Sequence, residues 1–109
     1  MRPAVRRGDV FLVALDPTVG TEIRKTRPCA VLSPDELNQH LRTVIVAPMT
    51  TGGHAYPYRV GARFQKKNGF VVLDQLRTVD VHRLVRRLGR LSPAAVATSL
   101  GILQEMFAE

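Results

Sequence analysis

Residues 8–17 read GDVFLVALDP, with six apolar side chains in a row between two pairs of residues that favour turns. A run of this length with such boundaries is typical of a β-strand whose two faces are both buried. Similar short apolar or β-branched runs recur along the chain and predict further strands. They lie at residues 30–32, 43–47, 56–60, 69–73, 76–79 and 84–91.

Several of these runs have features that refine the prediction. Pro57 lacks an amide donor, so the strand at 56–60 is expected at the edge of a sheet. The last run has leucines at helical spacing as well, but a strand is favoured there. Pro28 is expected to close a long loop that begins at Thr18. The strand at 43–47 is expected to end at Pro48, and the paired glycines of residues 49–54 predict a mobile loop.

Two helices complete the predicted fold. Ser33 is expected to cap a short helix that begins at Pro34 and ends near Leu41. Ser92 and Pro93 mark the start of a second helix. Apolar residues spaced by four, three and four positions define its predicted buried face, namely Val96, Leu100, Leu103 and Phe107. The chain is therefore expected to be α+β and mostly β, a small, strongly curved sheet or barrel against which the C-terminal helix packs.

Length and composition limit the classes of protein to consider. The 109 residues fit one domain, 1–109, and 45% hydrophobic with 23% charged residues excludes disorder as the main state. No apolar run approaches the roughly 18 residues of a membrane span. The single cysteine cannot form an intrachain disulfide, which favours a reducing compartment. We expect a soluble, cytoplasmic protein.

The charge indicates an anionic partner. Lys and Arg number 16 against 9 Asp and Glu, a net charge of +7, and 13 of the basic residues are Arg. Arginine favours planar, two-pronged recognition of phosphate or carboxylate, so nucleic acid or an acidic protein is indicated. A merely solvated basic surface, including Arg86, Arg87 and Arg90, is the alternative.

Common catalytic motifs are absent from the sequence. It has no glycine-rich phosphate loop, and His40, His54 and His82 lack the spacing of a zinc-binding helix. Cys29 lies in a predicted strand and is interpreted as a small buried hydrophobe. We therefore expect no metal and no cofactor.

Three polar segments between the strands remain as candidates for function. They are residues 21–27, 50–54 and 74–80. The first places one carboxylate, Glu22, among three cations. Structural ion pairs, Glu22 with Arg27 and Arg77 with Asp80, are the alternative explanation.

An ordered series of short motifs runs through nearly the whole chain. They are GDV at 8–10, DPTVGTE at 16–22, TRPCAVLS at 26–33, TVIVAPMT at 43–50, YPY at 56–58, VLDQLRTVD at 72–80, RL at 83–84 and LGRLS at 88–92. In this order they resemble the MazF/PemK/Kid ribonuclease toxins of bacterial toxin-antitoxin modules. Each motif is weak by itself, but their ordered series is specific.

The resemblance implies an SH3-like barrel of the MazF/PemK/CcdB type with a C-terminal helix, assembled as a homodimer. It implies metal-independent, sequence-specific cleavage of single-stranded mRNA, leaving a 2′,3′-cyclic phosphate and a 5′-hydroxyl. It also implies inhibition by a MazE-like antitoxin whose acidic, flexible tail occupies the RNA groove. By position, it assigns catalysis to Glu22, Arg27 and Thr50. The RNA contacts assigned or expected are Arg24, Lys25, Thr51, His54, Gln75 and Arg77.

These residue types suit the chemistry. Glu22, kept ionised by neighbouring cations, would accept the proton of the 2′-hydroxyl as that oxygen attacks phosphorus. Arg27 would donate hydrogen bonds to the non-bridging oxygens, and Thr50 would orient the phosphate. The proton for the leaving 5′-oxygen has two candidate donors, Arg27 and His54; a guanidinium is the poorer acid near neutral pH.

The sequence departs from the family pattern in two places. Family members commonly have a glycine between the catalytic Glu and Arg, whereas residues 23–26 here are Ile-Arg-Lys-Thr. This loop is expected to be stiffer, because few of its residues accept positive φ. Arg24 and Lys25 should strengthen phosphate contacts. Residues 61–68 also differ and are expected to help set the RNA sequence preference.

Two other functions fit the same barrel. CcdB poisons DNA gyrase without cutting RNA, but the Trp of its gyrase-binding segment has no counterpart here, since this chain has no Trp. A plain nucleic-acid-binding module would explain the basic surface but not Glu22.

Overall fold

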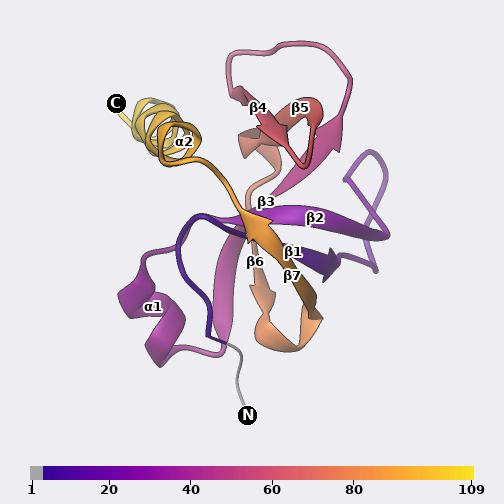
Figure 1. Ribbon diagram of the computed structural model, residues 1–109, viewed down its shortest axis with the longest axis vertical. Helices are drawn as coiled ribbons and strands as arrows, with labels where there is room; N and C mark the ends of the chain where they lie inside the picture. Colours follow the sequence, from indigo (N-terminus) through magenta and orange to yellow (C-terminus); the bar gives the residue numbers. More distant parts are fainter. Residues whose placement is uncertain (1–3) are drawn as a thin grey trace.

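The computed structural model describes residues 4–109 (Figure 1). Within this range the chain forms seven strands, two α-helices and two short 3-10 turns. In chain order they are β1 (Asp9–Ala14), β2 (Thr26–Val31), α1 (Asp35–His40), β3 (Thr43–Thr51), β4 (Arg59–Phe64), β5 (Lys67–Val72), η1 (Leu73–Gln75), β6 (Arg77–Asp80), η2 (Val81–Arg83), β7 (Leu84–Arg90) and α2 (Pro93–Met106). In that described part no helix is both long and apolar enough to cross a membrane.

The strands form one antiparallel sheet in the order β4-β5-β3-β2-β1-β7, and β6 pairs with β3. The long strand β3 holds the sheet together, since Val46 pairs with both Val31 of β2 and Arg77 of β6, whereas Thr50 pairs with Phe70 of β5. In Figure 1 the β4–β5 hairpin and α2 stand at the top, apart from β6 and α1 below. The predicted mostly β fold with a curved sheet and C-terminal helix is confirmed.

Both faces of β1 are buried, as the apolar run predicts. Phe11, Val13 and Leu15 belong to one apolar cluster, which also contains residues of β2, β3 and β6. Val10 points to the other face and joins a second cluster, shared by β4, β5 and α2. The alternation of side chains along a strand thus places the sheet between two small cores.

Several predicted boundaries are wrong. β2 begins at Thr26, four residues early, because its first residues pair with β1. β3 continues past Pro48 to Thr51, so Thr50 and Thr51 lie in a strand and not in a loop. Proline has no amide donor, but Pro48 is tolerated in β3. On the edge of β3 that pairs with β6 and β5, β6 pairs only as far as Val46 and β5 begins to pair at Met49, so within the described residues no strand lies opposite Pro48 there.

The edge strand expected at 56–60 is β4, which lies at the end of the strand order but begins later and forms a hairpin with β5. Pro57 precedes β4, which begins at Arg59. The turn of the hairpin consists of Gln65 and Lys66, both at positive φ, 50° and 65°. Two-residue turns of this type favour Asn and Gly, and neither is present here, so the turn was not recognisable from the sequence.

The predicted caps and buried residues of the two helices are only partly correct. Ser92 caps α2 as predicted, its Oγ accepting a hydrogen bond from the amide of Ala95 at 3.1 Å. Ser33 does not cap α1; its hydroxyl instead donates to Asn38 Oδ1. Phe107, predicted to be buried, is 73% exposed.

The buried face of α2 lies about one residue position around the helix from the predicted face. Its centre is the buried Ser99, whose hydroxyl donates to the carbonyl oxygen of Ala95 at 2.8 Å. Other residues on this face are Ala95, Val96, Ile102, Leu103 and Met106. Val96 and Leu103 were predicted correctly; Phe107 lies beyond the last turn.

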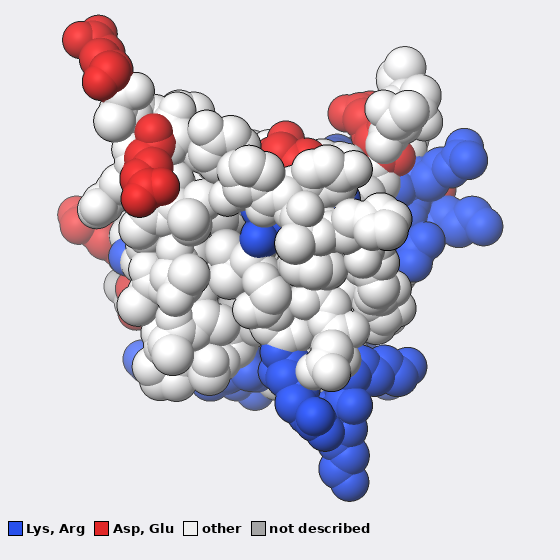
Figure 2. All heavy atoms as spheres, turned by 90° about the horizontal axis from the view of Figure 1, so that it is seen from above, with Lys and Arg blue, Asp and Glu red and all other residues white. Residues whose placement is uncertain are grey.

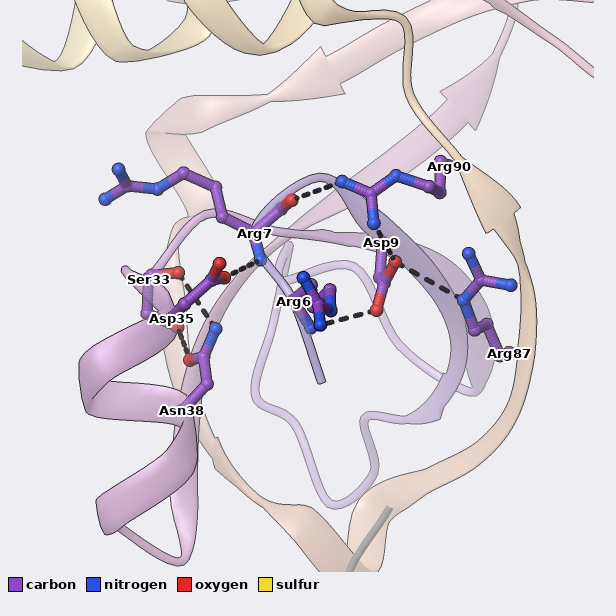
Figure 3. A network of polar contacts seen from close by, with 8 residues as sticks. All are labelled: Arg6, Arg7, Asp9, Ser33, Asp35, Asn38, Arg87 and Arg90. Carbon is purple, nitrogen blue, oxygen red and sulfur yellow. Dashed lines mark hydrogen bonds and ion pairs between the residues drawn. The ribbon is translucent and has the colours of Figure 1, made fainter. Parts of the chain in front are cut away.

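A buried carboxylate connects the start of the chain to β7 (Figure 3). Asp9 is 2% exposed. Its carboxylate accepts hydrogen bonds from Nη1 of Arg90 at 3.0 Å and from the backbone amide of Arg6 at 2.9 Å. It also lies 3.3 Å from Nε of Arg87. Arg90 also donates to the carbonyl of Arg7 at 3.0 Å. The interpretation of Arg87 and Arg90 as merely solvated surface is therefore wrong.

Candidate active site

A groove of about 550 Å³, here called the Glu22 groove, lies between the loop after β1 and the segment from η1 to β6. Its lining residues are Thr21, Glu22, Ile23, Pro48, Asp74, Gln75, Leu76 and Arg77. It joins parts of the first and third polar segments singled out in the sequence. The fold thus brings together residues that are more than 50 positions apart in the chain.

Glu22 is exposed at the end of a tight turn. Its carboxylate accepts a hydrogen bond from the amide of Val19, and its own amide donates to the Val19 carbonyl at 3.2 Å. Within residues 4–109 it forms no ion pair, so the alternative pairing with Arg27 is wrong. The turn therefore holds the carboxylate at the groove without neutralising it.

Gln75 fixes the loop that carries Glu22. Its side-chain oxygen accepts a hydrogen bond of 2.7 Å from the amide of Ile23. Gln75 was predicted to contact RNA, but in this structure its oxygen is used to anchor the loop.

Arg77 is half-buried at the inner side of the groove. Its Nη1 donates to the carbonyl oxygen of Leu15 at 3.1 Å, which joins β6 to the end of β1. The alternative pairing of Arg77 with Asp80 is wrong, because Asp80 accepts a hydrogen bond from the amide of His82 and lies 2.7 Å from its Nδ1. Arg77 therefore presents a positive charge to the groove in a fixed position.

A second hollow of about 240 Å³, here called the Thr50 pocket, lies beside the groove. Its lining residues are Arg27, Pro28, Met49, Thr50, Thr51, Ala62, Phe64, Gln65, Lys67, Gly69 and Phe70. Continuing the register of Cys29 opposite Pro48 by two residues brings Arg27 level with Thr50. Arg27 is exposed, and its Nε donates to the carbonyl of Arg24 at 3.3 Å.

The predicted catalytic residues are divided between these two hollows. Arg27, Thr50 and Thr51 line the Thr50 pocket, whereas Glu22 lines the groove. The two are adjacent because Pro48 and Met49, neighbours in β3, line one hollow each. The expected meeting of Glu22 with Arg27 does not occur as a direct contact in the described residues.

The remaining predicted RNA contacts lie outside both hollows. Arg24, Lys25 and His54 are exposed. Lys25 has φ 67°, so the loop contains a left-handed residue although it has no glycine there. The backbone amide of Lys25 donates a hydrogen bond of 3.0 Å to Asp16 Oδ1, which holds this conformation. Figure 2 shows basic side chains gathered at two edges of one face, with a largely uncharged surface between them.

No pattern in the sequence indicates that Phe70 belongs to the site, and Phe64 and Lys67 are marked there only as part of the unusual residues 61–68. All three line the Thr50 pocket, because the unrecognised hairpin folds over β3. Gly69 allows this approach: a Cβ there would overlap the Thr50 carbonyl oxygen and lie 2.9 Å from its carbon.

Two titratable side chains near the site have shifted pKa values. Hydrogen bonds from Arg59 lower the pKa of Asp74, which lines the groove. Burial raises the pKa of the Cys29 thiol to about 12. No cluster of three or more His, Cys, Asp or Glu side chains in residues 4–109 could hold a metal ion together.

Comparison with known proteins gives consistent matches. The family described as PemK-like, MazF-like toxin of type II toxin-antitoxin system matches residues 6–107. Endoribonuclease PemK of Escherichia coli is 33% identical over 105 residues, covering 91% of this chain and 79% of that protein. The crystal structure of MazF from Deinococcus radiodurans superposes with a TM-score of 0.80 at 26% identity, covering 97% and 96% of the two chains. A mycobacterial endoribonuclease in complex with its cognate antitoxin gives 0.69 at 27% identity, covering 90% and 96%.

Proposed function

Since the chain belongs to the family of PemK-like, MazF-like toxins of type II toxin-antitoxin systems, we propose that it is an endoribonuclease that cuts single-stranded mRNA at a preferred sequence without a metal ion. The products would be a 2′,3′-cyclic phosphate and a 5′-hydroxyl. The observation that carries the proposal is the placement of an unneutralised carboxylate, Glu22, beside a pocket that holds Arg27 and Thr50.

The reaction needs one proton removed and one supplied. Glu22 accepts the proton of the 2′-hydroxyl, and the oxygen attacks the adjacent phosphorus as the bond to the 5′-oxygen breaks. Arg27 donates N–H groups to the non-bridging oxygens, where charge develops, and the Thr50 hydroxyl orients the phosphate. The leaving 5′-oxygen takes its proton from His54 or Arg27, and variants of His54 distinguish the two.

Three further proposals follow from family membership. The chain assembles as a homodimer, with residues 1–109 as one domain in each copy. An acidic antitoxin tail binds the groove in competition with RNA, since Arg77 in the groove and the exposed Arg24 and Lys25 of the same loop as Glu22 favour anions. Since the substrate is mRNA, the protein acts in the cytoplasm.

The decisive experiment is incubation of the purified protein with a long single-stranded RNA in EDTA, followed by mapping of the RNA ends. We expect discrete cuts with 5′-hydroxyl ends. Glu22→Gln should slow cleavage by about 10²–10⁴-fold, and Arg27→Ala by at least about 10²-fold. Glu36→Gln and Arg86→Ala, which change exposed charges outside the two hollows, are the matched controls.

Intact RNA after incubation with the folded protein would contradict the enzyme and leave the gyrase-poison or binding-module functions. Loss of cleavage in EDTA would contradict the metal-free mechanism alone. Unchanged cleavage by His54→Gln would exclude His54 as the acid.

A further inference from the structure

An exposed aromatic ring is fixed at the approach to the Glu22 groove. Tyr56 lies in the connection between β3 and β4 and is 56% exposed. The guanidinium carbon of Arg59 lies 4.9 Å from the centre of its ring, a distance typical of a cation–π contact. The amide of Arg59 also donates to the Tyr56 carbonyl at 3.0 Å, so the turn itself holds the two residues together.

Arg59 is in turn held by an acid that lines the groove. Its Nε and Nη2 donate to the two oxygens of Asp74 at 3.1 and 3.2 Å, a two-pronged pair. These hydrogen bonds raise the pKa of Arg59 and lower that of Asp74, so both stay charged. Next to them, the amide of Leu73 donates to the Tyr58 carbonyl at 3.1 Å. The ring of Tyr56 is thereby connected to the groove through one guanidinium.

This arrangement has two effects on an anionic ligand. Pairing with Arg59 offsets the charge of Asp74, which would otherwise repel a phosphate in the groove. Arg59 also holds the ring of Tyr56 in place, and because this ring is exposed, part of its surface is not packed against the protein. Ordering an exposed aromatic side chain costs conformational entropy, and a ligand that stacks on the ordered ring avoids that cost.

We propose that Tyr56 is a specificity-determining residue that stacks against one unpaired base of the RNA in the Glu22 groove, with Arg59 as the positioning residue of its ring. The inference rests on the proposed function, since it names a substrate contact of the same site. Every nucleobase has a flat π-face, so the contact fits single-stranded RNA and excludes paired strands.

The rarity of aromatic residues adds weight to the assignment. Phe, Tyr and Trp make up only 6% of the chain. Among the described residues Tyr56, Tyr58 and Phe107 are the exposed aromatic side chains, and Phe107 lies at the end of α2. Only Tyr56 is held by a residue whose partner lines the groove, so Tyr58 offers a matched control from the same loop.

The test measures binding of a short, fluorescent, 2′-O-methyl RNA of mixed sequence, which lacks the attacking hydroxyl and cannot be cut. Tyr56→Ala should bind about 5- to 150-fold more weakly, the range that corresponds to the loss of stacking on one base. Tyr56→Phe and Tyr56→Trp should stay within about twofold of wild type, because the ring is kept. Tyr58→Ala should also stay within twofold, and Arg59→Met should weaken binding as Tyr56→Ala does.

A matched oligonucleotide without bases separates stacking from a general loss of structure. Tyr56→Ala should bind it as wild type does, because no base is present to stack. Equal binding of the 2′-O-methyl RNA by Tyr56→Ala and wild type would overturn the inference, as would equal losses with and without bases. Absence of measurable binding by wild type, or an effect of Tyr56→Ala on an acidic peptide but not on RNA, would overturn it too.

Cleavage by the wild type in the same preparation reports the proposed function separately. A wild type that binds through Tyr56 but does not cut refutes the nuclease and supports the stacking contact. If the Tyr56→Ala variant cuts as well as wild type and at the same sites, the stacking contact is refuted and the nuclease is left in place.

Discussion

Gly69 permits the close approach of β5 to β3 beside Thr50, and replacing it by alanine tests how strictly this approach is required. The new Cβ would overlap the Thr50 carbonyl oxygen, and it would lie 2.9 Å from the carbonyl carbon and 3.1 Å from the Cα of Thr51. All three contacts are backbone atoms, which cannot rotate away. The two strands must therefore separate where Thr51 pairs with Gly69 and Thr50 with Phe70.

The cost follows from these contacts. Overpacking of this kind destabilises proteins by about 1–3 kcal/mol, and each weakened backbone hydrogen bond adds about 1 kcal/mol. We expect Gly69→Ala to lose about 2–4 kcal/mol, which lowers the Tm by roughly 10 °C or more for a domain of this size. Displacement of Thr50 by about 1 Å should also slow RNA cleavage by about 10²-fold at a temperature where the variant is folded.

Gly61→Ala is the matched control. Gly61 lies on the neighbouring strand β4, opposite Phe70, and a Cβ there meets no atom within 4 Å. This variant should melt within a few degrees of wild type and cut RNA at the same rate. Circular dichroism melting and RNA cleavage of both variants decide the matter. Equal melting temperatures for the two variants would refute the reasoning.

Three further predictions concern groups outside the proposed catalytic residues. Burial raises the pKa of Cys29 to about 12, so at pH 8 its thiolate is about a thousandfold scarcer than at an ordinary cysteine and a thiol reagent should react only after denaturant is added. Asp9→Ala removes the buried acceptor of two half-exposed arginines and should cost about 1.5–3 kcal/mol in urea unfolding, a loss that Asp35→Ala at an exposed position should not produce. Gln65→Asn combined with Lys66→Gly supplies the residues that a turn with two positive φ angles prefers and should raise stability by about 1 kcal/mol; a lower Tm would contradict this.

Local signals predicted the elements that depend on few neighbours. The apolar run at residues 10–15 gave β1 and its burial on both faces, because six apolar side chains in a row between turn residues fit few other structures. Ser92 and Pro93 predicted the start of α2, since capping involves only the first turn. The family resemblance, carried by motifs spread along the chain, extended these local predictions to the whole fold.

The errors arose where tertiary pairing overrides local preference. Pro48 would end an isolated strand, but β3 continues past it because the edge that loses a donor has no partner there. Ser99 is the centre of the buried face of α2, although the predicted apolar face does not include it, because its hydroxyl donates to the carbonyl oxygen of Ala95 in the preceding turn. No window of sequence contains the partner strand or the opposing core that decides these cases.

The site shows the same division between local grouping and tertiary placement. The sequence grouped Glu22 with Arg27 because they share a predicted loop, but the chain bends between them at the left-handed Lys25, and Arg27 lies in β2. The groove instead joins Glu22 to Gln75 and Arg77, and the pocket joins Arg27 to Thr50. The residue types of the site could be predicted from the sequence, whereas their partners depend on strand register.

The separation of Glu22 from Arg27 is compatible with one reaction because a single strand borders both hollows. Pro48 lines the Glu22 groove and Thr50 the Thr50 pocket, two residues further along β3. At about 3.3 Å per residue this step is about 7 Å, a length that one nucleotide spans with its ribose and phosphate. In the proposed mechanism, a phosphate bound by Arg27 and Thr50 would leave the preceding ribose facing the groove. Its 2′-hydroxyl would there meet a carboxylate that forms no ion pair within residues 4–109. A direct Glu22–Arg27 ion pair would hold the proposed base against the proposed charge stabiliser, so their separation fits a mechanism in which each acts on a different part of the same nucleotide.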